Sequence, residues 1–121
     1  MTDFTMELGR DGVAVIAWDV PGRSMNVMSM EGFEALDALI GQALADDACK
    51  GIVLTSGKRD FAAGMDLAVI ARMREGGAQA IFDGVMRMHA VLRRIERAGM
   101  DPKTLKGGKP VCAALPGTAL G

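Results

Sequence analysis

The sequence has few of the residues that mark metal-binding, redox or disulfide-stabilised proteins. Its 121 residues include two cysteines, one histidine, four prolines, one tryptophan and no tyrosine. Cys49 and Cys112 have no metal-binding or redox spacing, which predicts free, buried thiols in a reducing compartment. His89 has no second His, Cys or acid at ligand spacing, so we expect a structural or surface histidine and no bound metal.

Charge and hydropathy argue against two further classes of function. The chain carries 14 basic and 15 acidic side chains, and this near balance, with few aromatic residues, argues against a nucleic-acid partner. Apolar runs such as Val13–Trp18 are too short to span a membrane. The first residues include an acid and lack the basic-then-apolar pattern of a secretory signal, so we expect a cytoplasmic protein.

The remaining composition is that of one globular domain over residues 1–121, half apolar and about a quarter charged. Apolar, β-branched runs predict four strands, at Phe4–Leu8, Val13–Asp19, Ile52–Thr55 and Val111–Leu115. We expect the last three to be adjacent in one sheet. The Asp-Gly pair between the first two runs predicts a hairpin turn.

Helical periodicity predicts three helices between these strands. One spans Met30–Ala45 after an N-capping Ser29, and a second spans Leu67–Arg74 after an N-capping Asp66. The third spans Ala78–Ala98, and its apolar residues recur on one side at helical spacing: Ile81, Val85, Met88, Leu92 and Ile95. Strands alternating with helices predict an α/β layered domain.

Two segments share a short apolar strand followed by a glycine-containing loop, and they are the candidate functional loops. The first covers Ile52–Leu67 and the second Lys109–Gly121. Their small residues would let a ligand approach the backbone closely. N–H groups at the start of a helix have no partner within the helix, and two such groups converging from separate loops would stabilise negative charge on a carbonyl oxygen.

The first segment contains Ser-Gly and then Phe-Ala-Ala-Gly-Met-Asp-Leu, which resembles the first-loop pattern of the crotonase superfamily of enoyl-CoA hydratases and isomerases. The second, Lys-Pro-Val-x-Ala-x-x-x-Gly-x-Ala-Leu-Gly, resembles that superfamily's second-loop pattern. The segment Pro21–Met28 is similar to its early Asn-containing turn. The resemblance implies a crotonase-like α/β fold of repeated β-β-α units, incomplete at its C-terminus, with residues 1–121 as the N-terminal portion of the domain.

The resemblance also implies an enzyme of fatty-acid β-oxidation whose substrate is a coenzyme A thioester, with no covalently bound cofactor. It makes the backbone N–H of Met65 the first oxyanion donor, and we expect this N–H to point into an open cleft without a partner. The second donor would follow Gly121, which borders it. The positions that touch coenzyme A or the thioester are Arg23, Met25, Ala62, Ala63, Gly64 and Asp66. For Asp66 we favour helix capping over a role as catalytic acid.

Several alternatives stay open on the sequence alone. Two glutamates act in hydratases, and the resemblance places both beyond Gly121, so the chain is expected to be inactive by itself. It could also be a non-catalytic acyl-CoA-binding or oligomer-building fragment, or part of an isomerase or thioester hydrolase. The segment Gly76–Gly108 is similar to the insert of fused hydratase/3-hydroxyacyl-CoA dehydrogenase proteins, and the full-length protein is expected to be a homo-oligomer. Lys58 and Arg59 could meet coenzyme A phosphates or stay solvated, and Asp60 is expected to be a solvated loop carboxylate.

Overall fold

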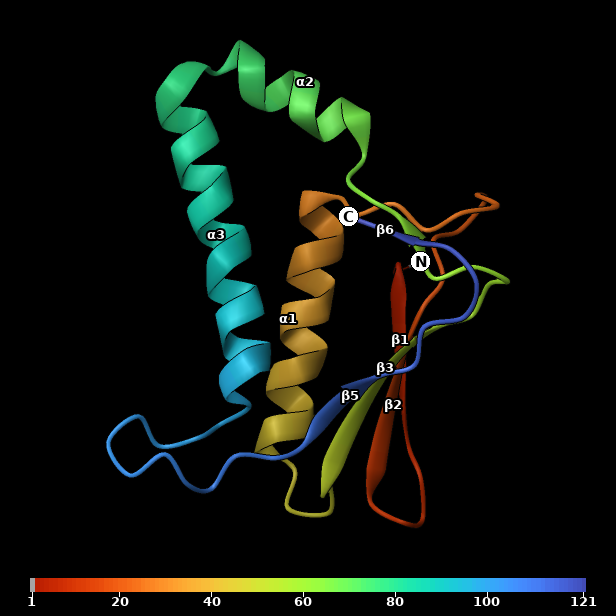
Figure 1. The fold of residues 1–121 in the computed structure, drawn as a ribbon, viewed down its shortest axis with the longest axis vertical. Helices are drawn as coiled ribbons and strands as arrows, with labels where there is room; N and C mark the ends of the chain where they lie inside the picture. Colours follow the sequence, from red (N-terminus) through yellow and green to blue (C-terminus); the bar gives the residue numbers. More distant parts are fainter. Residues whose placement is uncertain (1) are drawn as a thin grey trace.

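A four-stranded sheet packed on one helix forms the main body of the computed structural model, which describes residues 2–121 (Figure 1). Strands β1 (Phe4–Leu8) and β2 (Val13–Trp18) form the predicted antiparallel hairpin. Strands β3 (Gly51–Ser56) and β5 (Val111–Ala113) extend the sheet in the order β1-β2-β3-β5, and both of these pairings are parallel. The prediction that three of the runs are adjacent in one sheet is confirmed.

Helix α1 (Met30–Ala45) covers one face of this sheet and closes the core. It begins where predicted, because the Ser29 hydroxyl accepts the Gly32 N–H at 2.9 Å and so pairs one of the free donors of the first turn. Successive side chains of a strand point to opposite faces, so alternate residues of β2 enter the core. The buried core is built from Phe4, Ala14, Ile16, Trp18, Val20, Leu36, Ile40, Ala43, Cys49, Ile52 and Ala62.

Two very short strands that the sequence did not reveal complete a repeated β-β-α pattern. Strand β4 (Ala62–Ala63) follows β3, and strand β6 (Ala119–Leu120) follows β5; the two pair in parallel as a separate sheet. On the other side of the first loop, Met28 forms a parallel bridge with Met65. The second and third turns of the chain therefore each add one strand to the large sheet, β3 and β5, and one to the small sheet, β4 and β6, which stacks the loops of these turns.

Helices α2 (Leu67–Glu75) and α3 (Gly77–Arg97) form a helical arm beside this body (Figure 1). Both helices lie where predicted, but no residue of α3 is buried, and Ile81 and Leu92 of the apolar stripe are 40% and 52% exposed. Val85, Met88 and Ile95 of the same stripe are half-buried, and Ile95 packs against the core. Ion pairs join Arg87 to Glu34 and Arg94 to Asp37.

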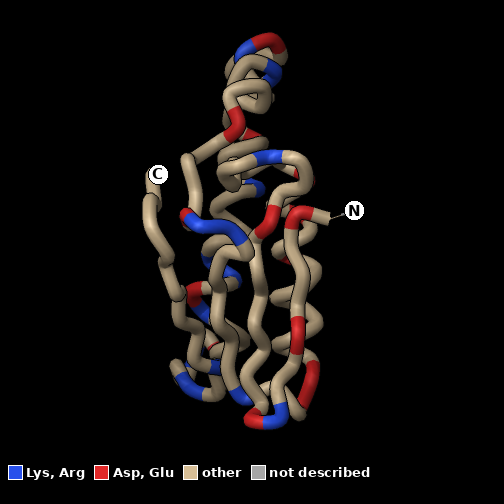
Figure 2. The backbone as a smooth tube through the Cα atoms, turned by 90° about the vertical axis from the view of Figure 1, so that its right-hand side faces the viewer, with Lys and Arg blue, Asp and Glu red and all other residues tan. Residues whose placement is uncertain are grey.

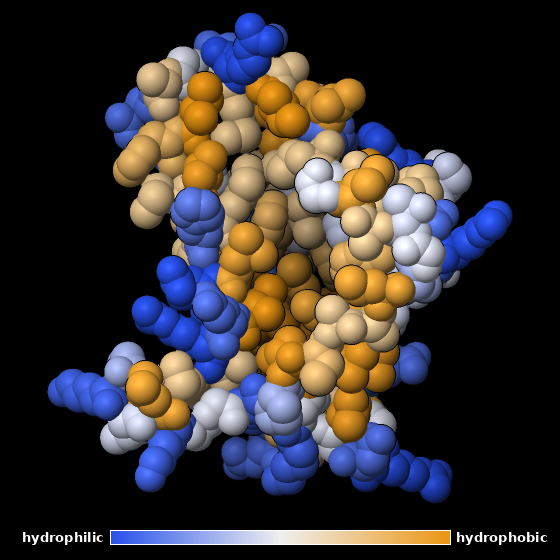
Figure 3. Space-filling view, in the orientation of Figure 1, coloured by the Kyte–Doolittle hydropathy of each residue, from blue (hydrophilic) through white to orange (hydrophobic). Residues whose placement is uncertain are grey.

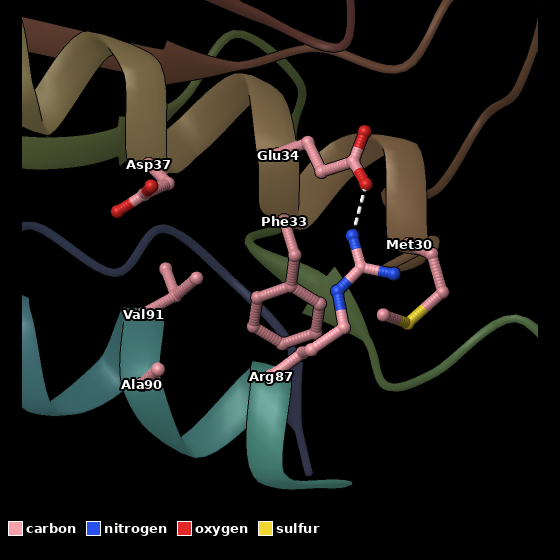
Figure 4. A pocket seen from close by; sticks show the side chains of 7 residues that line it. All are labelled: Met30, Phe33, Glu34, Asp37, Arg87, Ala90 and Val91. Carbon is pink, nitrogen blue, oxygen red and sulfur yellow. Dashed lines mark hydrogen bonds and ion pairs between the residues drawn. The ribbon is translucent and has the colours of Figure 1, made fainter. Parts of the chain in front are cut away.

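A cavity of about 220 Å³ lies between α1 and α3, and its lining explains this contact (Figure 4). The Phe33 ring and the Val91 side chain face each other across it, and the Arg87 guanidinium reaches over Phe33 to the Glu34 carboxylate. Met30, Asp37 and Ala90 complete the lining. The helix–helix contact is thus partly apolar and partly ionic, and it covers the apolar stripe of α3 only in part.

The two cysteines differ from each other in burial. Cys49 is buried in the core as predicted, but the prediction for Cys112 is wrong, since its side chain is exposed. Cys112 lies on β5, an edge strand of the sheet, where it pairs with Val53 of β3.

Charges are interspersed along the backbone rather than gathered by sign (Figure 2). Among residues 2–121, none of the helices has the length and apolar character that crossing a membrane requires.

Candidate functional site

Asn26 is fully buried, and its amide anchors the first loop to the ends of two strands. Its Nδ2 donates to the carbonyls of Trp18 and Phe61, each at 2.9 Å, and lies 3.0 Å from the Ser56 hydroxyl oxygen. Its Oδ1 accepts the Val20 N–H at 3.0 Å. Because only a neutral amide both donates and accepts in this way, Asn26 fixes the start of the loop relative to the sheet.

The backbone N–H of Met65 is one of the donors of this loop that have no hydrogen-bond partner among residues 2–121, and the N–H of Leu67 is another. The Met28 N–H donates to the Gly64 carbonyl at 2.9 Å, and the Asp66 N–H donates to the Met28 carbonyl at 2.8 Å. Between these two bonds the N–H of Met65 forms no hydrogen bond with any part of residues 2–121. Gly64 has φ +83°, a conformation that favours glycine, and it bends the chain just before this free N–H.

The first and second loops meet at their glycines. A Cβ on Gly64 would lie only 3.2 Å from the carbonyl oxygen of Gly121, so the lack of a side chain permits this approach. The N–H groups of Phe61 and Ala62 both donate to the Thr118 carbonyl, at 2.9 and 3.1 Å. Ala62 also buries its methyl group in the core, so its part in any site is limited to its main chain.

Asp66 has two partners, one for each carboxylate oxygen. Its Oδ1 accepts the Ala68 N–H at 2.9 Å, which confirms that it caps α2, and its Oδ2 lies 3.2 Å from the Arg23 guanidinium. This ion pair brings the turn before α1 to the start of the helical arm. Arg23 and Met25 line a cavity of about 400 Å³ there, together with Gly22, Ser24 and Val27.

Two charged residues of the first loop have roles that the sequence did not predict. The Lys58 ammonium donates to the Asp19 carboxylate at 2.6 Å and to the Val20 carbonyl at 2.8 Å, and its side chain is only 12% exposed. The side chain of Asp60, a partly exposed loop carboxylate, also accepts the Thr118 N–H at 2.8 Å. No local pattern signals this contact, since its partner lies on the next turn of the chain.

The electrostatic character of the site comes from backbone dipoles rather than from side chains. The free N–H of Met65 stands two residues before the start of α2, where the helix dipole is positive. Such a donor can stabilise negative charge developing on an oxygen. Within residues 2–121, no three His, Cys, Asp or Glu side chains gather as a metal site would require.

Comparison by sequence finds relatives of one kind, although no family model matches the chain. The chain is 38% identical to the fatty acid oxidation complex subunit alpha of Idiomarina loihiensis, over 98% of the chain and 15% of that protein. It is 31% identical to the subunit of the same name in Shewanella oneidensis, again over 98% and 15%. The chain therefore spans about 15% of the length of these curated relatives.

Comparison by structure gives the fold. An enoyl-CoA hydratase from Shewanella pealeana matches with a TM-score of 0.80 at 14% identity, over 95% of this chain and 39% of that one. The enoyl-CoA hydratase from Thermoplasma volcanium matches with a TM-score of 0.77 at 22% identity, over 97% and 41%. A Legionella pneumophila protein provisionally assigned as an enoyl-CoA hydratase/isomerase (crotonase) matches with a TM-score of 0.81 at 18% identity, over 97% and 41%.

The two comparisons agree with each other and with the stacked β-β-α turns. The sequence likeness extends over nearly the whole chain, and the structural likeness covers both the large sheet and the loops that carry the free N–H. The chain has the fold of the crotonase-type enoyl-CoA hydratases, and over nearly its whole length its sequence is similar to alpha subunits of fatty acid oxidation complexes.

Proposed function

We propose that residues 1–121 are the N-terminal portion of an enoyl-CoA hydratase domain of fatty-acid β-oxidation. The observation that carries the proposal is the free backbone N–H of Met65, held by hydrogen bonds on both sides of it. This N–H donates to the thioester carbonyl oxygen, on which negative charge develops as the double bond reacts. A donor that is already in place costs no reorganisation during the reaction.

The register of the small sheet supports the second donor. Ala63 pairs with Leu120, so Gly64 stands beside Gly121, and one further step places Met65 beside the position after Gly121. Two N–H groups at adjacent positions of neighbouring strands can converge on one oxygen. We infer that Gly121 borders this second donor.

The remaining site residues bind the coenzyme A part of the substrate. Arg23 is paired with Asp66, the residue after Met65, and its exposed guanidinium meets the phosphates. Met25 and the main chain of Ala62, Ala63 and Gly64 line the path to the thioester. Neither a metal nor a covalently bound cofactor has a part in this scheme. The parent protein works in the cytoplasm as a homo-oligomer.

A second candidate, a non-catalytic acyl-CoA-binding fragment, is favoured by the state of Asp66. Both of its oxygens are engaged, one by the Ala68 N–H and one by Arg23, so it is not available to move protons. The glutamates that transfer protons in hydratases would then lie outside residues 1–121. On this second proposal the longer polypeptide lacks such acids as well, and it binds the substrate without turning it over.

The test uses crotonyl-CoA and the loss of absorbance of its conjugated thioester. We expect no turnover by residues 1–121 and turnover by the longer polypeptide of which they form part, because a donor and the acids each supply about 10²–10³-fold. In the longer chain, Met65→Pro removes the N–H, while Met65→Ala keeps it. We expect Met65→Pro to lower kcat by about 10²–10³-fold and Met65→Ala to stay near the parent.

Three outcomes contradict parts of this proposal. Turnover by residues 1–121 near the rate of the longer chain would assign the proton transfer to an acid within them, first of all Asp66. A folded Met65→Pro variant with full activity would show that the Met65 N–H is not an oxyanion donor. A longer chain that binds crotonyl-CoA without turnover would support the non-catalytic candidate instead. The position of the next glutamate along the parent sequence distinguishes a hydratase from an isomerase or hydrolase relative.

A further inference from the structure

Asp60 connects the first loop to the second through its side chain. Its Oδ1 accepts the Thr118 N–H at 2.8 Å, across 58 positions of the chain. Its own backbone is held by the Ser56 hydroxyl, which donates to the Asp60 carbonyl at 2.7 Å. Asp60 forms no ion pair within residues 2–121, and its side chain is hydrogen-bonded to the Thr118 N–H.

Gly117 shows how closely the second loop approaches this carboxylate. A Cβ at Gly117 would lie 2.3 Å from Asp60 Oδ1 and 3.0 Å from the Arg59 carbonyl oxygen, and its φ is +55°. A side chain at this position would push the loop off the carboxylate. The backbone of the second loop is thus shaped to accept the contact.

Both backbone polar groups of Thr118, its N–H and its carbonyl, are hydrogen-bonded to the first loop. Asp60 takes its N–H, while the N–H groups of Phe61 and Ala62 donate to its carbonyl. Strand β6 begins at the next residue and pairs with β4 over only two positions. A pairing of two residues fixes the position of β6 beside β4 only weakly. A hydrogen bond to a carboxylate is stronger than one between neutral groups.

We propose that Asp60 is a positioning residue that clamps the second loop to the first and thereby sets the separation of the two oxyanion donors. The inference rests on the proposed function, in which one donor is Met65 and the other follows Gly121. Asp60 itself touches neither substrate nor reacting atoms. Its effect reaches them through the placement of β6 beside β4.

The first experiment measures the clamp without reference to catalysis. Amide hydrogen exchange at Thr118 in the 121-residue chain is compared for the parent, Asp60→Ala and Asp60→Asn. We expect Asp60→Ala to speed exchange about tenfold and Asp60→Asn, which keeps an acceptor oxygen, to change it by less than about threefold. Glu75→Ala removes a carboxylate elsewhere and serves as the control. Unchanged exchange in folded Asp60→Ala would overturn the clamp.

The second experiment measures crotonyl-CoA hydration by the longer polypeptide. We expect Asp60→Ala to lower kcat by about 10–100-fold with KM within about threefold, because displaced donors stabilise the transition state less. Asp60→Asn restores most of kcat. If Asp60→Ala fails to fold, Gly117→Ala disturbs the same contact from the second loop and should lower kcat likewise.

The two failures are distinguishable. An active parent whose Asp60→Ala variant keeps full kcat overturns the positioning role alone. A loss confined to thermal stability, with kcat unchanged at 25 °C, also overturns it, since a merely structural contact would give that result. A parent that does not turn over crotonyl-CoA overturns the positioning role together with the proposed function, and the exchange result still decides whether the clamp exists.

Discussion

Two regions of the molecule, the sheet with α1 and the helical arm α2–α3, differ in what stabilises them. In the sheet and α1, side chains such as Ile16, Ile40 and Ile52 are exposed by 2% or less. In α3, a helix of 21 residues, none is buried. Apolar side chains gather on the surface of the arm and in the hollow beside it (Figure 3). Those most exposed are Leu67, Ile70, Ile81, Phe82, Met86 and Leu92.

Local stability therefore differs between the packed core and the helical arm. Regions with few buried apolar contacts open locally at a lower free energy than a packed core. The arm is joined to α1 by a few half-buried apolar side chains, such as Val91, and by exposed ion pairs, such as that of Arg94 with Asp37, which contribute little. The donor of Met65 lies where the two regions meet, anchored to the sheet side through Asn26 and followed at once by the arm.

The largest expected effect comes from truncating one side chain in each region. Ile40→Ala should lower the free energy of unfolding of the 121-residue chain by about 2–5 kcal/mol, because it removes buried methyl groups and leaves a cavity. Leu92→Ala, at a side chain that is 52% exposed, should change it by less than about 0.5 kcal/mol. Urea denaturation followed by circular dichroism measures both. Equal losses would mean that the arm is part of the same cooperative core.

The sequence predicted the packed half well because its signals are local. The apolar, β-branched run of β2, the hairpin glycine and the cap at Ser29 each act within a few residues, and the structure has all three. The bounds of α2 and α3 were predicted, but the way in which α3 packs against α1 was not. A stripe of apolar residues shows that a helix has an apolar side, but it does not say that this side will be covered within the same chain.

The candidate site was only partly predictable for a similar reason. The glycine at position 64 and the cap at Asp66 follow from local chemistry, and both are present. The contacts of Asn26 with Phe61 and of Asp60 with Thr118 join residues 35 and 58 positions apart. Such contacts depend on the stacking of successive turns, and the two-residue strands that produce it are too short to leave a periodic pattern.

A smaller effect is expected at Asp66, where the arm begins. Asp66→Ala removes the cap of α2 and should destabilise that helix by about 1 kcal/mol, while Asp66→Asn keeps a capping oxygen and loses only the exposed pair with Arg23. Amide exchange along α2 measures the difference, and exchange in β2 serves as the internal reference. Equal exchange in the two variants would mean that the ion pair, rather than the cap, fixes the start of the arm.

The smallest effect is expected in the link that returns the arm to the sheet, and it depends on pH. The backbone N–H groups of Thr104 and Lys103 donate to the Asp101 carboxylate, and they hold the pKa of Asp101 below its ordinary value of 3.8. A lowered folded-state pKa means that this turn is stabilised above pH 3.8 and that the stabilisation is lost as the pH falls through the lowered pKa.

Two further bonds close the same turn, from the Leu105 N–H to the Asp101 carbonyl and from the Asp101 N–H to the Lys106 carbonyl. We therefore expect the amide signals of Lys103 and Thr104 to shift in an NMR titration with a midpoint below 3.8, and Asp101→Asn to abolish that step. The carboxylate is fully exposed, so the effect on global unfolding should be too small to measure, and the titration is local. A midpoint at or above 3.8 would mean that the hydrogen bonds from Lys103 and Thr104 to the Asp101 carboxylate do not hold this turn in solution.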